Sequence, residues 1–314
     1  MRNRTEESSQ RSVFLPGSRH RLDSPSLLRD SFLEDVSFGL VPSGSRGKKA
    51  QVCVTLEPAN AAAESLLGEA FNTSYGEGLQ EGVADLIRRA AYRVCEEDRA
   101  IHEIVFFRPG PNERPTRVDL VEINGATLRQ HGADWCQVVP ETEAKARGWP
   151  QEIVLPRDSL LFFTMPPAWC RQVRDAREML VNLGGPEFFG LGLGAQDRGI
   201  PYEFAAHDRT ARLALADIGR TIGWTARGRF NADMLSFVWI GMHLRFERFK
   251  MDLRNHLLGE LNAAIARIGV ECGFTGEIRV SGLPTQAKID AALAGLASGQ
   301  FPFTEVMDKF EQSP

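Results

Sequence analysis

The most regular pattern of apolar positions in the chain lies between Arg245 and Gly269. Apolar side chains recur there at every third or fourth residue, which is the period of one face of an α-helix. The opposite face carries charges of both signs, which can pair at helical spacing. The pattern predicts a long helix with one buried side. It is either an ordinary packed helix with a solvated face or a helix that packs on copies of itself. The seam consists of Phe246, Phe249, Leu253, Leu257, Leu261 and Ile265.

Shorter elements precede this helix between residues 50 and 166. The segment "QVCVTL" has the composition of a strand, and Glu77 to Cys95 has a helical apolar face. Three strand-like stretches come after it, namely "IHEIVFFRP", "TRVDLVEING" and "EIVLPRDSLLFFTMP", the last divided at Pro156. A helix followed by clustered strands predicts an α+β domain over residues 50–166.

The rest of the chain is predicted to be mainly helical. Residues 167–270 form a stem-like region: a helix at about 168–183, a Gly-rich loop at 184–204, and helix from 208 to 269 with interruptions at Gly223 and near Gly228. Residues 271–314 form a C-terminal segment with a strand "GEIRVSG", a short helix and a last amphipathic turn "FTEVMDKF".

The N-terminal residues 1–49 differ in composition from the rest of the chain. They contain nine Lys or Arg against six Asp or Glu, a balance of +3 that leaves −7 for the remainder of a chain whose formal charge is −4. They are also rich in Ser, Pro and Gly, which is typical of a flexible arm. The apolar piece "SFLEDVSFGL" is the candidate docking point of this arm. We expect deletion of residues 1 to 40 to leave the monomer fold intact.

Composition excludes several classes of protein. With 314 residues and 43% hydrophobic content the chain is long enough for a substantial core. The formal charge of −4 argues against a general basic surface that would hold nucleic acid. Five scattered cysteines without a CxxC pair predict reduced thiols and no zinc site. We find no signal peptide and no stretch of roughly 18 apolar residues that would span a membrane, so a cytoplasmic location is expected.

No motif specifies a catalytic or cofactor site. The glycines of "GLGLG" do not have the dinucleotide-binding spacing, and "GSRGKKA" lacks parts of a phosphate-binding loop. The histidines show no metal-binding spacing. Cys136 near His131 is a weak candidate nucleophile, and Glu103, Asp119 and Glu122 are candidate paired carboxylates on strands. We therefore predict no enzyme activity, no metal and no cofactor.

The order of elements resembles that of tailed-bacteriophage portal proteins, the head-tail connectors. The stretch "IHEIVFFRPGPNERPTRVDLVEINGATL" after a helix is similar to the portal wing, and "EIVLPRDSLLFF" to the strand that precedes the passage toward the stem. "DRTARLALADIGRTIGW" and "LRFERFKMDLRNHLLGELNAAI" resemble the long helical part, and "IDAALAGLASGQFPFTEVMDKF" resembles the crown. The resemblance covers about residues 65 to 310.

This resemblance implies an α+β, portal-like fold with a wing, a helical stem and a short helical crown. It implies a structural virion protein, assembled in the host cytoplasm, that forms a dodecameric ring at one capsid vertex for DNA packaging and ejection. The implied partners are the major capsid protein, terminase, adaptor or tail proteins and the double-stranded DNA in the channel, with no membrane. The seam would then pack within the ring, with the charged face of its helix toward the next subunit or the channel. Arg46, Lys48 and Lys49 either touch DNA or belong to a solvated linker.

Two other functions stay open at this point. The first is another structural component of the virion head-tail junction, such as an adaptor or a minor capsid protein. The second is an intracellular α+β enzyme that uses His102, Glu103 or Glu122. A concave pocket with convergent polar groups would favour the enzyme.

Overall fold

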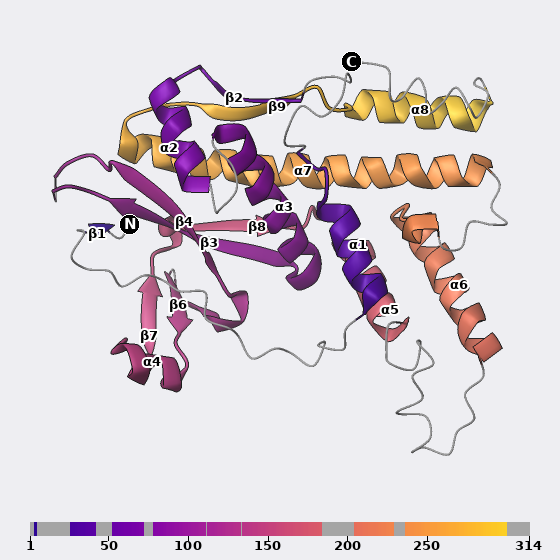
Figure 1. Ribbon diagram of the computed structural model, residues 1–314, viewed down its shortest axis with the longest axis horizontal. Helices are drawn as coiled ribbons and strands as arrows, with labels where there is room; N and C mark the ends of the chain where they lie inside the picture. The colour runs from indigo at the N-terminus through magenta and orange to yellow at the C-terminus, as the bar shows by residue number, and fades with distance from the viewer. Residues whose placement is uncertain are drawn as a thin grey trace.

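The computed structural model describes residues 3–4, 26–41, 52–71, 78–110, 112–132, 134–183, 204–228 and 236–299. It shows an α+β protein in which three small sheets lie beside the helices (Figure 1). The helices are α1 (Leu27–Ser37), α2 (Ala61–Phe71), α3 (Leu79–Glu97), α4 (Glu141–Arg147), α5 (Cys170–Leu183), α6 (Phe204–Thr221), α7 (Ser236–Cys272) and α8 (Gln286–Ser298). The strands are β1 (Asn3–Arg4), β2 (Cys53–Glu57), β3 (Arg99–Phe107), β4 (Arg117–Ile123), β5 (Leu128–His131), β6 (Asp134–Val138), β7 (Glu152–Leu155), β8 (Leu160–Thr164) and β9 (Glu277–Ser281). Short 3-10 helices lie at Gly125–Thr127, Arg157–Ser159 and Ala226–Gly228.

Strand β3 is the centre of the largest sheet. It pairs antiparallel with β4 along one edge and with β8 along the other, while β1 pairs parallel with its last two residues. All of its residues from Ala100 to Phe106 are buried, because structure covers both faces of the sheet. This burial explains why the apolar alternation of "IHEIVFFRP" is imperfect. β5, β6 and β7 form a separate antiparallel sheet.

Helix α7 runs along the whole molecule (Figure 1). Its 37 residues correspond to about 55 Å at 1.5 Å per residue. Its C-terminal half packs against α3 and β8, and α8 lies antiparallel beside its N-terminal half. The bounds of the elements show that most of the strands and helices predicted from the periodic pattern are present at the expected places.

The break between α6 and α7 arises from a close approach of two backbones. Gly223 has a φ of +93°, and a Cβ at this position would lie 2.2 Å from the carbonyl oxygen of Met242. Only glycine fits this conformation and this space. The predicted interruption at Gly223 thus lets the end of α6 lie directly against α7.

Helix α1 differs from the arm that the composition predicts. Phe32, Leu33 and Val36 are completely buried in the main hydrophobic cluster. The hydroxyl of Ser26 caps α1 by accepting a hydrogen bond from the Arg29 N–H at 3.2 Å, and it donates to the carbonyl of Leu180 at 2.8 Å. Residues 26–41 are therefore a structural part of the core. The charged and Gly-rich flanks obscured this short apolar helix in the sequence.

The main cluster is also continuous across the boundaries predicted at residues 50, 167 and 271. It extends from Leu28 to Ile278 and includes buried side chains of α1, α3, α5, α6 and α7. Strand β2 pairs over its full length with β9, near the other end of the chain. Asn262 on α7 supports this pair by donating to the Ile278 carbonyl at 3.0 Å and accepting from the Ile278 N–H at 2.7 Å. The segments between those boundaries therefore share one core.

Candidate assembly surface

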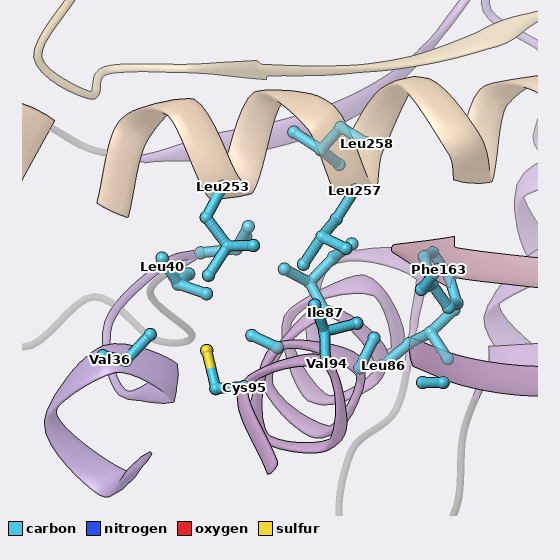
Figure 2. Packing of buried hydrophobic residues seen from close by; sticks show 14 of the residues in the cluster. Val36, Leu40, Leu86, Ile87, Val94, Cys95, Phe163, Leu253, Leu257 and Leu258 are labelled. Carbon is cyan, nitrogen blue, oxygen red and sulfur yellow. The ribbon is translucent and has the colours of Figure 1, made fainter. Parts of the chain in front are cut away.

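The predicted seam of α7 is buried within the chain itself. Phe249, Leu253, Leu257, Leu261 and Ile265 are each 0% exposed, and Phe246 is half-buried. Figure 2 shows the underside of the helix over α1, α3 and β8. These side chains already have partners in the same chain, so contact with another subunit must use other parts of the helix. Leu253 and Leu257 point from α7 toward the side of the cluster where the figure labels Val36, Leu40, Leu86, Ile87, Val94, Cys95 and Phe163.

Much of the charged face of α7 is also occupied within the chain. Arg248 binds Asp290 of α8 and lies 3.4 Å from Asp252. The Asp252 carboxylate accepts a hydrogen bond from the Trp169 indole N–H at 3.0 Å. These bonds tie the face to neighbouring segments, which limits the contacts with a next subunit or a channel that the portal resemblance implied.

A second group of polar contacts joins α7 to the end of β8. The Glu260 carboxylate accepts from the Thr164 backbone N–H at 2.9 Å and from its hydroxyl at 2.6 Å. His256 lies 3.3 Å from the same carboxylate and 3.1 Å from the Thr164 hydroxyl. Burial raises the pKa of Glu260, and the two hydrogen bonds from Thr164 oppose this shift. The arrangement anchors the helix to the sheet.

The N-terminal end of α7 has an exposed apolar surface. Phe237 and Val238 are each 42% exposed and Trp239 is 37% exposed. Three consecutive helical residues point in directions about 100° apart, so a single neighbouring helix cannot cover all three. α8 covers the next turn, where Leu296 packs with Ile240 and Leu244. We call Phe237, Val238 and Trp239 the apolar end of α7.

Sequence reasoning missed the apolar end. The predicted seam begins at Phe246, whereas the uninterrupted apolar run from Phe237 to Ile240 was the available signal. Trp239 also stacks on His243, with ring centroids 5.6 Å apart and an interplanar angle of 7°. Large apolar side chains that are exposed at consecutive positions are candidates for a contact with another molecule. The apolar end is therefore the candidate assembly surface.

Three features predicted from the sequence lie outside the described residues. They are the possible DNA contacts Arg46, Lys48 and Lys49, residues 184–203 of the Gly-rich loop, and the amphipathic turn at 303–310.

The sheet separates the carboxylates that the enzyme hypothesis would combine. Glu122 is paired with His102 across β3 and β4, so these two residues share one face, while Glu103 is on the other. The Glu122 carboxylate accepts a hydrogen bond from Arg93 at 3.0 Å. Glu103 is completely buried, and neither of its carboxylate oxygens has a hydrogen-bond partner in the part of the chain that the structure describes. The two carboxylates thus do not converge on one site.

The cysteines and histidines show no activated pair among the described residues. Cys136 and His131 have different cross-strand partners, Arg129 and Asp134. Burial raises the pKa of the Cys136 thiol, with a smaller contribution from Glu152. Burial also raises the pKa of Cys95 to about 12. No group of three or more His, Cys, Asp or Glu side chains in the described part of the chain could hold a metal ion.

His102 provides a pH-dependent test of the core. It is 2% exposed and contacts the Phe163 ring edge-on, and among the described residues neither of its ring nitrogens has a hydrogen-bond partner. Burial, with a smaller contribution from Arg89, lowers its pKa from 6.5 to about 3. The unfolded chain therefore binds a proton between these pH values that the folded chain does not, and stability falls as pH falls through this range. We expect the wild type to lose about 2 kcal/mol of unfolding free energy between pH 7 and pH 5 at this site.

The variant His102→Leu removes the titrating group and keeps an apolar side chain. In urea unfolding at pH 7 and pH 5, its stability should depend less on pH than that of the wild type. His131→Leu, at an exposed position on β5, is the matched control and should retain the wild-type profile. Identical pH profiles for wild type and His102→Leu would show that His102 is not held neutral in the folded chain.

No helix in the described part of the chain is long and apolar enough to cross a membrane. No protein-family model matches the sequence, and no curated protein matches it. Among solved structures, the chain is similar to a chain from the neck of an empty GTA particle, computed with C6 symmetry. The two are 12% identical, the similarity covers 91% of this chain and 89% of the other, and the TM-score is 0.42. These values are too low to assign a family or a function.

Proposed function

We propose that the chain is a structural subunit of a phage-like virion that closes into a ring at the junction of head and tail, as portal proteins do. The proposal starts from the element order that resembles portals: a helix, clustered strands, a long helical part and a short helical end. The observation that carries it furthest is the apolar end of the 37-residue helix α7. In an isolated subunit this surface is in contact with water. A neighbouring subunit in the ring would cover it, which is favourable for apolar groups.

The contact would be heterologous, since a ring joins two different surfaces of identical subunits. Function would then reside in the assembled channel. Duplex DNA would pass through it during packaging and ejection, and terminase, adaptor or tail proteins and the capsid would bind its ends. The formal net charge of −4 suits a channel for DNA. A strongly basic channel lining would bind the DNA phosphates and slow the movement of the DNA.

The mass and shape of the purified chain test this proposal. We expect light scattering to give a multiple of 34.8 kDa and electron microscopy to show closed rings with a central hole wide enough for duplex DNA. The double variant Val238→Glu with Trp239→Glu should assemble less, because it places charge in the proposed contact. Leu213→Glu, at a position on α6 that is 63% exposed, is the control and should assemble normally.

A chain that stays monomeric at every concentration, or rings that the double variant leaves unchanged, would contradict this proposal. Rings too narrow for duplex DNA would instead favour another head-tail component.

A further inference from the structure

A small cavity lies where α7 passes the end of α1 and the start of α8. Its volume is about 40 Å³, compared with roughly 10–15 Å³ for one enclosed water molecule. This is enough for a group the size of a carboxylate. The lining combines apolar side chains with three charged ones, and we call it the basic notch. Its residues are Gly39, Leu40, Glu247, Lys250, Met251, Arg254, Leu283, Pro284 and Ile289.

The charges of the basic notch are unbalanced. Lys250 has a partner, since its Nζ lies 3.6 Å from Glu247 and 5.7 Å from the centre of the Phe246 ring. Arg254 is half-buried, and its hydrogen bond is made by Nε to the side-chain oxygen of Asn255 at 3.3 Å. Burial lowers the pKa of Arg254, and Glu247 offsets this shift only in part. The notch therefore holds two cations against one carboxylate.

The other arginines of α7 use their donors within the chain. Arg248 binds Asp290, Arg245 donates to the Arg220 carbonyl at 2.6 Å, and Arg267 donates to two backbone carbonyls. In the part of the chain that the structure describes, the two terminal nitrogens of Arg254 have no hydrogen-bond partner and no carboxylate within salt-bridge distance. A guanidinium group presents two parallel donors that match the two oxygens of a carboxylate.

An exposed aromatic residue is the sequence neighbour of a residue that lines the basic notch. Phe38 is 75% exposed and immediately precedes Gly39 of the lining. The notch itself has an apolar floor, to which Leu40, Met251 and Ile289 contribute. Apolar surface around a desolvated charge is the pattern found at the centre of protein contacts.

We propose that the basic notch receives an Asp or Glu carboxylate from a neighbouring copy of this chain, with Phe38 packing beside it. This inference rests on the proposed ring, in which one surface of a subunit meets a different surface of the next. The full chain carries a formal net charge of −4, so a second copy offers more carboxylates than cations. Arg254 would gain the bidentate partner that the described residues of its own chain do not supply.

The test compares ring assembly of the full-length wild type with that of Arg254→Gln by mass photometry over a range of concentrations. Gln retains much of the aliphatic stem and removes the charge. We expect half-assembly of the variant to need at least about tenfold more protein, because a hydrogen-bonded charge pair is lost. The dissociated variant should melt at the wild-type temperature. Added NaCl should weaken wild-type assembly more than that of the variant.

Arg171→Gln is the matched control, because Arg171 lies on α5 with 90% of its side chain exposed and is 3.6 Å from Asp175. It should assemble like the wild type. If Arg254→Gln also forms rings at wild-type concentrations, this inference is wrong while the proposed ring stands. If the wild type forms no oligomer at all, both are wrong. A third outcome also overturns the proposal. If acetate raises the melting temperature of the wild-type monomer but not that of Arg254→Gln, and both proteins assemble at the same concentration, the notch binds a free carboxylate and not one from a neighbouring copy.

Discussion

Replacement of Leu257 and Leu261 together by Asp is expected to abolish the cooperative unfolding transition of the chain. Both leucines are 0% exposed and belong to the main hydrophobic cluster, and Figure 2 shows Leu257 on the side of α7 that faces α3. Truncation of one buried leucine alone costs about 2–5 kcal/mol, and a buried carboxyl group without a partner adds to this cost. The total approaches the roughly 5–15 kcal/mol by which a domain is stable. Circular dichroism during heating measures the result.

Val270→Asp is the matched control for this experiment. Val270 lies on the same helix but is 82% exposed, so the added charge remains in water. This variant should keep the wild-type melting temperature within a few degrees. A soluble double variant that melts cooperatively near the wild-type temperature would show that the seam is not part of the core.

Deletion of residues 1–41 is expected to leave the chain unstable or insoluble, in contrast to the expectation from composition. The segment places six nearly inaccessible apolar side chains in the main cluster: Leu28, Phe32, Leu33, Val36, Leu40 and Val41. At about 1.5–3 kcal/mol for each fully buried side chain, their loss removes on the order of 10 kcal/mol of burial. It also exposes the surfaces of α3 and α5 that α1 covers.

Deletion of residues 1–25 alone separates the role of α1 from that of the preceding chain. It removes the two-residue strand β1 and leaves α1 in place, so the melting temperature should change little. The point variant Phe32→Ala should cost about 3–5 kcal/mol, because the ring is fully buried and lies edge-on against Trp224 with centroids 5.3 Å apart. Equal melting temperatures for the wild type and the 1–41 deletion would show that α1 is dispensable.

The sequence predicted elements best where one period persisted over many residues. Helix α3 and the C-terminal half of α7 each have an apolar face that repeats through several turns, and the structure buries both faces. The strands β3, β4, β7 and β8 also lie where the composition placed them, including the division at Pro156. Local periodicity determines such elements because each must bury one side.

Helix α2 and the strands β5 and β6 were not predicted. α2 is 11 residues long with an alanine-rich start, and β5 (LRQH) and β6 (DWCQV) are less apolar than the equally short β2 (CVTLE) and β7 (EIVL), which were predicted. Helix α1 was noticed as an apolar piece and interpreted as a docking point of an arm. Its burial depends on Leu180 and Trp224, which are far away in sequence.

The candidate surfaces could be predicted from the sequence less well than the helices and strands, because they depend on how the elements pack in the tertiary structure. Sequence patterning located the apolar seam of α7, but could not show that the same chain covers it. Nor could it show that α8 covers Ile240 while Trp239 stays partly exposed. The pairing of Arg248 with Asp290 and the unbalanced charge at Arg254 likewise depend on which elements meet.

The sequence by itself determined the α+β class, the long helix with one buried face and the order of most elements, because these depend on local periodicity and chain order. The tertiary structure alone decided that α1 belongs to the core, that β2 pairs with β9, that Val238 and Trp239 stay exposed at the start of α7, and that Arg254 lines the basic notch. Those outcomes depend on contacts between residues up to more than 200 positions apart in the chain, such as Cys53 and Ser281, and no local pattern encodes such contacts.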